Sequence, residues 1–371
     1  MEQKAYWVAF NLVKGIGAVR FQALVDYFGS LEIAWKAGES ELMAAGLSQR
    51  IIEGLTSIRN QTDPVEQYEA ILGKGIQIII KEDPEYPEKL LNIDQPPPVI
   101  YMRGSIKPED RWAVAVVGTR RVTSYGRQVT EQVATYLARN GMTVVSGLAR
   151  GVDGVAHHSA LAGGGRTIAV LGSGLDQIYP PEHRQLAEKI AENGAVISDY
   201  HPSTPPDSGN FPPRNRIIAG LSLATVVVEA GETSGALITA TFAAEQGREV
   251  FAVPGPIYAP QSKGTNRLIH QGAQPLLDPV NILESLNLRK VDHYKQATLL
   301  LPVDELESKL MEILNLEPVH IDDIQSKAGY PVEKVSAALT MMELKGMVRQ
   351  VSGMTYLAIH DERETYRIGD G

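Results

Sequence analysis

The run AVAVVGTRRVTSYG, residues 113–126, consists of five apolar residues, a glycine and a polar stretch that leads into a helix. Similar apolar runs recur at 143–145, 167–171, 195–198, 224–229 and 250–253, with helical patterns between most of them. Strands that are apolar on both faces and alternate with helices are typical of a parallel sheet covered on both sides. The sequence therefore predicts an α/β fold with a doubly wound, mostly parallel, Rossmann-like sheet.

The segments on either side of this sheet have different patterns. Short amphipathic stretches precede it, and a proline-rich stretch carrying one short strand joins the two. We therefore predict six segments: a small helical domain of the SAM or helix-hairpin-helix type (1–75), a connector (76–111), the Rossmann-like domain (112–287), a polar linker (288–298), a winged helix (299–361) and a tail (362–371).

Composition narrows the function classes. The 371 residues include no cysteine, which excludes disulfides, thiolate nucleophiles and thiolate metal ligands and suits a reducing cytosol. The N-terminus lacks a signal pattern and no long apolar window occurs, so we expect a cytoplasmic protein without a membrane span. A net charge of −9 argues against nucleic acid at first, but residues 112–216 hold ten Lys/Arg against eight Asp/Glu, so any polyanion site is expected there.

Features suited to phosphate follow the first two strands of the predicted sheet. In parallel α/β sheets, ligands bind where strands end and where loops present amide N–H groups and helix N-termini. After the first strand, Gly118 and Thr119 permit a tight turn and Arg120 adds a fork of donors; after the second strand, Ser146 and Gly147 repeat the design. Both loops also fit ordinary strand-to-helix turns.

The block FPPRNRIIAGLS, residues 211–222, places a basic pair beside an aromatic ring. Arg214 and Arg216 flank Asn215 at the start of a helix, and Phe211 offers a face on which a base can stack. Phosphate clamps beside an aromatic ring are typical of single-stranded-DNA binding.

These side chains also have structural alternatives. Arg216 can pair with Glu229 or Asp199 as a bridge, and Phe211 can fill the rim of the sheet. The next helix opens with two further residues that either add N–H donors or only cap that helix, Ser234 and Gly235.

Two other ligand classes are weighed against single-stranded DNA. A dinucleotide cofactor requires G-x-G-x-x-G after the first strand; the nearest match, at 172–177, follows the third strand without the last glycine, so we expect no cofactor. A nucleotide-processing enzyme of the lysine-decarboxylase-like phosphoribohydrolase type has the pattern P-G-G-x-G-T-x-x-E, which residues 227–235 do not reproduce. Its candidate acids, Glu229 and Glu232, lack a histidine or metal partner nearby in sequence. We therefore expect no catalytic residue and no metal site.

Seven ordered motifs between 117 and 273 resemble the DprA/Smf family of bacterial DNA-processing proteins: VGTRRVTSYG, SGLARGVDGVAH, TIAVLGSGLDQIYPPEH, FPPRNRIIAGLS, the 229–240 segment, REVFAVPGPI and KGTNRLIHQGA. The resemblance implies a protein that is not an enzyme, that binds and protects incoming single-stranded DNA, and that dimerises through its central domain. It further implies that the protein loads the RecA recombinase during natural transformation.

Carried over residue by residue, the resemblance makes Phe211 the base contact. Residues 201–210, where some members have an extra basic residue, contain no Lys or Arg. The phosphate site that the resemblance implies consists of Gly118, Thr119, Arg120, Ser146, Gly147, Arg214, Asn215 and Arg216.

Two flanking features bear on partners. Leu268 and Ile269, on a short predicted helix, form either a dimer patch or the side of that helix that faces the sheet. In the winged helix, the recognition helix expected at 331–345 has no net positive charge, so partner binding or self-packing is expected there instead of duplex reading. Its charged residues are Glu333, Lys334, Glu343 and Lys345.

Overall fold

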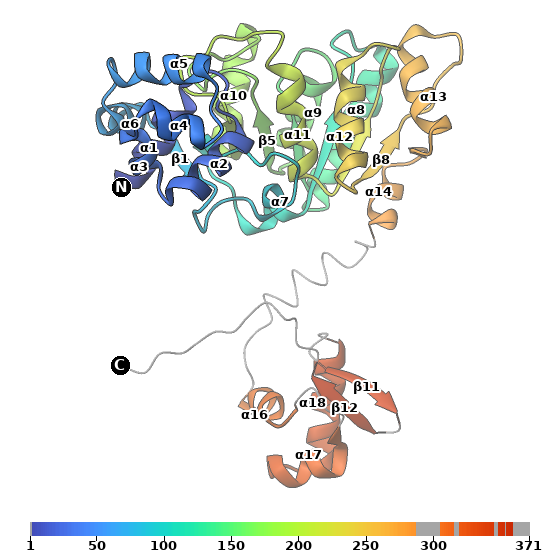
Figure 1. The fold of residues 1–371 in the computed structure, drawn as a ribbon. Helices are drawn as coiled ribbons and strands as arrows, with labels where there is room; N and C mark the ends of the chain where they lie inside the picture. Colours follow the sequence, from blue (N-terminus) through green and yellow to red (C-terminus); the bar gives the residue numbers. More distant parts are fainter. Residues whose placement is uncertain (1, 287–304, 315–318, 345–347, 353, 359–371) are drawn as a thin grey trace. The chain divides into compact units, whose positions relative to one another are not determined.

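The computed structural model divides the chain into two compact units, residues 1–289 and 290–371 (Figure 1). The predicted linker at 288–298 and the predicted tail at 362–371 lie outside the described residues. No helix within the described part of the chain is long and apolar enough to cross a membrane. The structure describes residues 2–286, 305–314, 319–344, 348–352 and 354–358.

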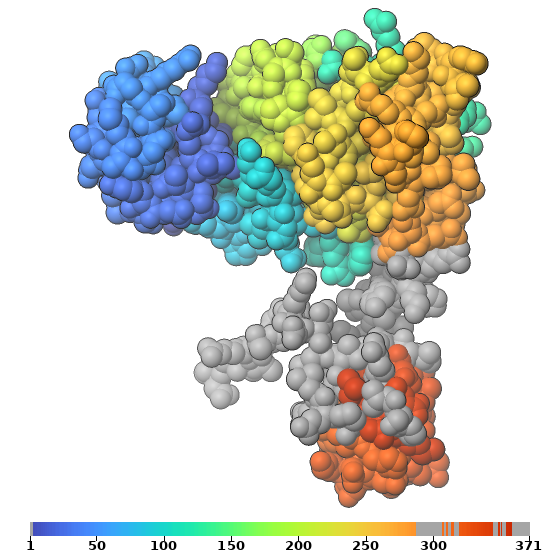
Figure 2. Space-filling model, turned by 45° about the vertical axis from the view of Figure 1, so that its right-hand side comes forward, coloured from blue at the N-terminus to red at the C-terminus, as the bar shows by residue number. Residues whose placement is uncertain are grey.

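Six helices open the first unit and enclose an aromatic core. The rings of Trp7 and Phe21 stack with their centroids 5.6 Å apart, and Phe10 meets Phe21 and Trp35 edge to face. In the space-filling view these helices form the blue lobe at one end of the unit (Figure 2). They confirm the predicted helical N-terminal part. The helices are α1 (Glu2–Asn11), α2 (Ala18–Phe28), α3 (Leu31–Lys36), α4 (Glu39–Ala44), α5 (Gln49–Arg59) and α6 (Pro64–Gly73).

A nine-stranded sheet forms the centre of the first unit, in the order β1-β2-β6-β5-β4-β3-β7-β8-β9. The strands from β6 to β9 pair in parallel, whereas β2 pairs antiparallel with both β1 and β6. All six predicted strands are present, which confirms the mostly parallel, Rossmann-like sheet. The strands are β1 (Gln77–Ile80), β2 (Val99–Gly104), β3 (Ala113–Val117), β4 (Thr143–Ser146), β5 (Thr167–Val170), β6 (Gly194–Ser198), β7 (Ala224–Val227), β8 (Glu249–Ala252) and β9 (Gln274–Pro275).

The segment 76–111 does more than connect. It supplies both β1 and β2, and β2 extends the sheet by pairing with β6. The short strand expected in the proline-rich stretch is β2. The pattern did not show that β2 joins the large sheet, because its pairing with β6 involves residues much later in the chain, which no local pattern records. The exact boundaries drawn between the helical domain, the connector and the Rossmann-like domain stay a prediction.

Helices cover both faces of the sheet (Figure 1). α8 and α9 pack against Val114, Val116 and Val144, whereas α11 and α12 pack on the other face against Ala115 and Val145. Alternate residues of β3 therefore face opposite layers, as the apolar run at 113–117 requires. The helices of this part are α7 (Glu88–Leu91), α8 (Ser124–Arg139), α9 (Val152–Ala162), α10 (Arg184–Glu192), α11 (Phe211–Leu221), α12 (Gly235–Glu245), α13 (Lys263–His270) and α14 (Val280–Ser285), with 3₁₀ turns at Pro108–Arg111, Pro181–His183 and Pro260–Ser262.

The chain reverses its winding direction beside β3. It proceeds from β3 through β4 and β5 to β6, and then α11 returns it to the other side of β3, where β7 begins. Ligands of open α/β sheets commonly bind outside the carboxyl ends of strands at such a switch point. Loops after the strands on either side of β3 are therefore the place to look for a site.

His157 on α9 gives this fold a pH dependence. Its Nδ1 lies 2.7 Å from Oγ1 of Thr167, and its buried Nε2 has no hydrogen-bond partner among the described residues. Burial, together with the charges of His183 and His158, lowers the pKa of His157 to about 3. Between that pKa and the ordinary value of about 6.5, the unfolded chain binds a proton that the folded chain excludes. Stability is therefore lost as the pH falls through this window.

We expect the free energy of unfolding to fall by about 1.4 kcal/mol per pH unit from this group between about pH 6 and pH 4. Tryptophan fluorescence during denaturation reports on the first unit, because all three tryptophans, Trp7, Trp35 and Trp112, lie in it. The variant His157→Gln should have a flatter profile than the natural chain over that range. Identical profiles for the two proteins would contradict a buried neutral imidazole.

The second unit is the predicted winged helix. Among the described residues of this unit, three helices pack around Leu310, Ile324 and Leu339, and an antiparallel sheet has the order β10-β12-β11. α18 takes the place of the expected recognition helix; Lys345 lies outside the described residues. The elements are α16 (Glu305–Ile313), β10 (Val319–His320), α17 (Ile321–Ala328), α18 (Val332–Leu344), β11 (Val348–Ser352) and β12 (Thr355–Ala358).

Candidate nucleic-acid interface

Phe211, the first residue of α11, lies against the loop that follows β5. Its ring is half-buried, and a Cβ added to Gly172 would lie 2.8 Å from a ring carbon. A glycine at 172 therefore lets this loop pass directly beside the ring. A contact between a loop and a helix that begins about forty residues later leaves no local signal, so the sequence pattern at 172–177 suggested only a comparison with cofactor sites.

A cation and a second aromatic ring flank Phe211. The guanidinium carbon of Arg120 lies 5.3 Å from the centroid of the Phe211 ring, and the ring of Tyr179 lies 5.9 Å away at an interplanar angle of 37°. Arg120 is exposed and Tyr179 is 36% exposed, so solvent reaches both beside Phe211. Tyr179 was absent from the predicted site residues. An aromatic residue in the segment between the third strand and the next helix is the signal that points to it.

Arg214 lies beneath this group and is buried, with 4% of the residue exposed. Its Nη1 donates to the carbonyl of Gly147 at 2.9 Å and to the carbonyl of Val170, and its Nε donates to Oδ1 of Asn215 at 3.2 Å. A Cβ on Gly147 would lie 2.7 Å from the guanidinium, so glycine is required there. Arg214 thus ties the loops after β4 and β5 together, with its guanidinium 6.0 Å from the Phe211 ring centroid.

Asp153, in the first turn of α9, brings a buried carboxylate to the loop after β4. It accepts hydrogen bonds from the backbone N–H groups of Gly147 at 3.1 Å and Ala149 at 3.4 Å. Burial raises the pKa of Asp153 and lowers the pKa of Arg214 to about 10, and each charge opposes the shift of the other. Ser146 is buried too, and its hydroxyl donates to a carbonyl of β3 at 2.7 Å. The amide of Gly147, predicted to bind phosphate, therefore binds an internal carboxylate.

Glu229, which follows β7, brings a second internal carboxylate to the loop after β3. Its carboxylate accepts hydrogen bonds from the backbone N–H of Thr123 at 3.0 Å and from the Thr123 hydroxyl at 2.5 Å. The Thr123 hydroxyl in turn accepts from the backbone N–H of Gly126 at 3.0 Å and caps α8. The N-terminus of α8, which the sequence pattern assigned to phosphate, therefore holds the side chain of Glu229.

Gly118 and Thr119 shape the turn that presents Arg120. A Cβ on Gly118 would lie 2.6 Å from the side chain of Val152 on α9, so this glycine allows close packing of helix and strand. The backbone N–H of Thr119 donates to the carbonyl of Glu229 at 2.7 Å. Both residues serve as support, and the exposed Arg120 side chain is what this loop offers to a ligand.

Arg216 forms the structural bridge that the sequence left open as an alternative. Its Nη2 lies 2.9 Å from Oδ2 of Asp199, and its Nε donates to the carbonyl of Gln95 at 3.0 Å. Asp199, and not Glu229, is its partner, and both side chains of the pair are largely buried. The guanidinium of Arg216 is therefore engaged by Asp199 and by the backbone of Gln95.

Asn215, Ser234 and Gly235 lie where α11 and α12 begin. The side-chain amide of Asn215 donates to the carbonyl of Gly235 at 3.3 Å. The hydroxyl of Ser234 accepts from the backbone N–H of Ala236 at 3.3 Å and caps α12. Asn215 is buried, whereas Gly235 is exposed with open space around it. These residues join two helices, and the exposed part of the site remains around Phe211.

Comparison with known proteins identifies the family. The pattern of the family described as DNA recombination-mediator protein A matches residues 77–287, more than half of the chain. This chain belongs to that family, DprA/Smf. A second pattern, described as the DprA winged helix domain, matches residues 295–354.

Curated and solved DprA/Smf proteins resemble the chain over most of its length. Protein Smf of Synechocystis sp. is 38% identical, with 95% of this chain and 98% of that protein covered. DNA processing protein DprA of Bacillus subtilis is 37% identical, with 70% and 90% covered. The X-ray structure of DprA from Streptococcus pneumoniae superposes with a TM-score of 0.67 at 30% identity, covering 76% of this chain and 97% of that one. DprA from Helicobacter pylori, studied for its single-stranded-DNA binding mode, gives 0.52 at 34% identity, covering 57% and 95%.

Within this DprA/Smf chain, the structure also places the two residues considered for a dimer patch. Leu268 packs against the core under α11 and α12, and Ile269 is half-buried. Leu268 therefore fits the alternative of a side chain that faces the sheet. Exposed apolar side chains nearby in sequence are Ile257 at 71%, Tyr258 at 89% and Leu277 at 78%.

Proposed function

We propose that this chain binds single-stranded DNA across the carboxyl ends of β3, β4 and β5. The observation that carries the proposal is the group formed by Arg120, Phe211 and Tyr179, in which two rings and a guanidinium share one solvent-facing site. Aromatic rings stack on bases of any sequence, and a guanidinium beside them neutralises a phosphate. The Helicobacter pylori relative, studied for its single-stranded-DNA binding mode, supports the same ligand.

The geometry favours an unpaired strand over a duplex. Phe211 is half-buried and Tyr179 is 36% exposed, and a base can stack on such a ring only when it is unstacked from its neighbours. Arg214 contributes from below by holding the loops and the Phe211 ring in place. Phe211 and Tyr179 thus serve as stacking surfaces, and Arg120 serves as the phosphate contact.

Local charge supports this site despite the net charge of −9. Arg120, Arg121 and Arg127 are exposed on the segment that runs from the end of β3 into α8. None of the three forms an ion pair with any residue that the structure describes. Unpaired arginines along one segment attract a phosphate backbone through their local field.

Family membership supports a finer role. We infer that the chain protects incoming single-stranded DNA, acts as a dimer formed through the central domain and loads the RecA recombinase in natural transformation. Ile269 remains the candidate from the predicted dimer patch, because Leu268 is engaged by the core. In this proposal the chain acts in the cytoplasm and binds DNA without catalysing a reaction.

The contacts of the two candidate acids, Glu229 and Glu232, favour binding over nucleotide processing. Glu229 caps α8 through Thr123, and the carboxylate of Glu232 lies 3.3 Å from Nζ of Lys263. Neither is paired with a histidine in the part of the chain that the structure describes, so neither has a partner for proton transfer there. Incubation with nucleoside monophosphates and assay for released base separates the two functions.

The test of the site is the salt dependence of binding. Arg120→Ala is expected to weaken binding to a labelled oligonucleotide of any sequence and to flatten the slope of log affinity against log salt by about 0.7 to 1, the value for one lost phosphate contact. Arg139→Ala, at the exposed far end of α8, serves as the matched control and should leave both quantities unchanged. An unchanged slope in Arg120→Ala would overturn the assignment of this residue.

A further inference from the structure

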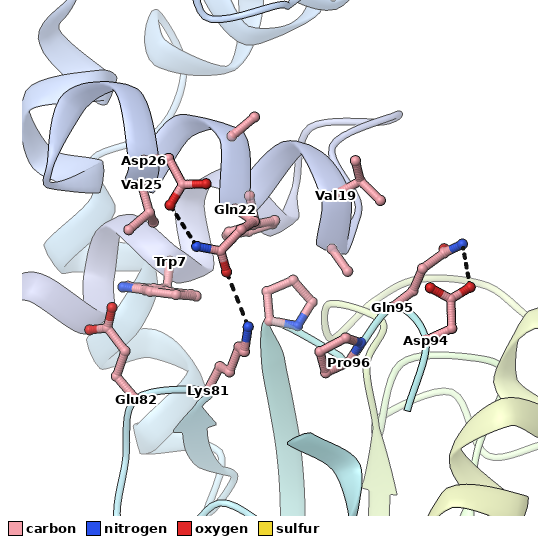
Figure 3. A pocket seen from close by; sticks show the side chains of 14 residues that line it. Trp7, Val19, Gln22, Val25, Asp26, Lys81, Glu82, Asp94, Gln95 and Pro96 are labelled. Carbon is pink, nitrogen blue, oxygen red and sulfur yellow. Dashed lines mark hydrogen bonds between the residues drawn. The ribbon is translucent and has the colours of Figure 1, made fainter. Parts of the chain in front are cut away.

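A cavity of about 550 Å³ lies between the N-terminal helices and the segment that carries β1 and β2. Figure 3 shows its walls: Trp7 from α1, one side of α2, the residues after β1 and the loop that ends at Pro98. Its size falls within the range of sites that bind ligands. It is separate from the group around Phe211, with which it shares no residue.

The cavity combines an apolar interior with an acidic border. Trp7, Phe21 and Pro98 are buried and form its floor, while Val19 at the border is 67% exposed. Three carboxylates and one ammonium group line it, which leaves an excess of negative charge. These charged residues are Asp26, Glu82, Asp94 and Lys81.

The three carboxylates have neutral partners. Asp26 accepts from the side-chain amide of Gln22 at 2.8 Å, Glu82 from that of Gln3 at 3.3 Å, and Asp94 from that of Gln95 at 3.4 Å. None of the three forms an ion pair with a residue that the structure describes. Figure 3 shows that the ammonium of Lys81 donates to Gln22 and not to a carboxylate. The border is therefore free to receive cations from a ligand.

We propose that this cavity docks a segment of a partner protein in which an apolar or aromatic side chain is flanked by Lys or Arg. The buried floor accepts the apolar side chain, and the carboxylates around it accept the cations. The same carboxylates repel phosphate, so the cavity is unsuited to nucleic acid. The chain thereby presents a protein-binding surface in addition to its proposed site for DNA.

One wall of this docking cavity is tied to α11, the helix that carries Phe211. Gln95 adopts a left-handed backbone conformation with φ of 57°, and its carbonyl accepts the hydrogen bond from Nε of Arg216. Arg216 is held in turn by Asp199. The wall is therefore prepared before a partner arrives, and the Nε–H of Arg216 offers an NMR signal that senses occupation of the cavity.

The test selects phage-displayed random 12-residue peptides on the full chain and measures the affinity of the most enriched peptide. We expect enriched peptides with Lys or Arg around an apolar residue, and binding that shifts the indole N–H signal of Trp7. The triple variant Asp26→Lys/Glu82→Lys/Asp94→Lys should bind the peptide roughly tenfold more weakly or worse. A matched triple variant at exposed acids of the neighbouring helices, Glu39→Lys/Glu53→Lys/Glu69→Lys, should bind it as the natural chain does.

A second variant guards against a change in folding. Val19→Arg adds a bulky cation at an exposed position of the border and should also reduce peptide binding, while tryptophan fluorescence stays that of the natural chain. The proposal is overturned by enriched peptides that lack cations, by peptides that bind the charge-reversed variant equally well, or by the absence of enrichment. Affinity for single-stranded DNA should persist in Val19→Arg, so loss of peptide binding is separable from failure of the DNA site.

Discussion

Replacement of Arg214 by methionine is expected to lower the free energy of unfolding of the first unit by about 2 to 5 kcal/mol, because two buried carbonyls lose their donor at a cost of about 1 to 3 kcal/mol each. Methionine keeps much of the volume of the side chain and removes its charge and its donors. The measurement is the denaturation midpoint followed by tryptophan fluorescence. This loss is a large part of the stability of a typical domain.

The size of this effect follows from what the guanidinium holds. Arg214 satisfies the buried carbonyls of Gly147 and Val170, and it is the cation that opposes the burial-driven rise in the pKa of Asp153. Without it, the two carbonyls remain buried without this donor, and the buried carboxylate of Asp153 keeps its backbone hydrogen bonds but loses the cation that opposes its desolvation.

A second substitution identifies the electrostatic part of this cost. Asp153→Asn in the Arg214→Met background removes the unpaired buried charge and should restore part of the lost stability. Arg127→Met, at an exposed position on α8, is the matched control and should leave the midpoint nearly unchanged. An Arg214→Met protein with the midpoint of the natural chain would show that the buried guanidinium is dispensable.

The parallel strands could be predicted because their signal is local. Each run from β3 to β8 is apolar on both faces and is followed by a turn. The pattern at 113–117 and its repeats were therefore sufficient to predict the fold class. The short strand of the proline-rich stretch was predictable as well, but its place in the large sheet was not, since β2 pairs with β6, whose residues come much later in the chain. The Gly118 and Gly147 turns were likewise predictable, because each turn needs a small residue at the end of a strand.

The part of the site that escaped prediction depends on contacts between distant residues. Glu229 and Asp153 occupy amide groups that the loop sequences alone offer to a phosphate. A loop motif states which donors exist, and only the fold decides which acceptors reach them. For the same reason the sequence did not show that Arg214 is buried, because an arginine at the start of a helix is also typical of a phosphate contact. Nor did it show that Tyr179 lies beside Phe211, because Tyr179 belongs to no motif that predicts a ligand contact.

The remaining large effect concerns DNA. Phe211→Ala is expected to weaken binding of single-stranded oligonucleotides by roughly ten- to a hundredfold, because stacking on one base is worth about 1 to 3 kcal/mol. Phe211→Trp keeps a ring at this position and should retain most of the affinity. Tyr27→Ala removes an aromatic side chain that is 53% exposed on α2 and should have no effect. Fluorescence anisotropy of a labelled oligonucleotide measures all three variants.

The salt dependence separates the part of Phe211 from that of Arg120. The slope against salt counts the phosphates that the protein neutralises, and an uncharged ring neutralises none. Phe211→Ala should therefore lower the affinity while the slope stays that of the natural chain. Arg120→Ala should change the slope. Because the guanidinium lies 5.3 Å from the ring centroid, the ring also orients the cation, and the double variant should lose less than the sum of the two single losses. Full affinity in Phe211→Ala would mean that bases stack elsewhere, and Tyr179 would then be the first ring to test.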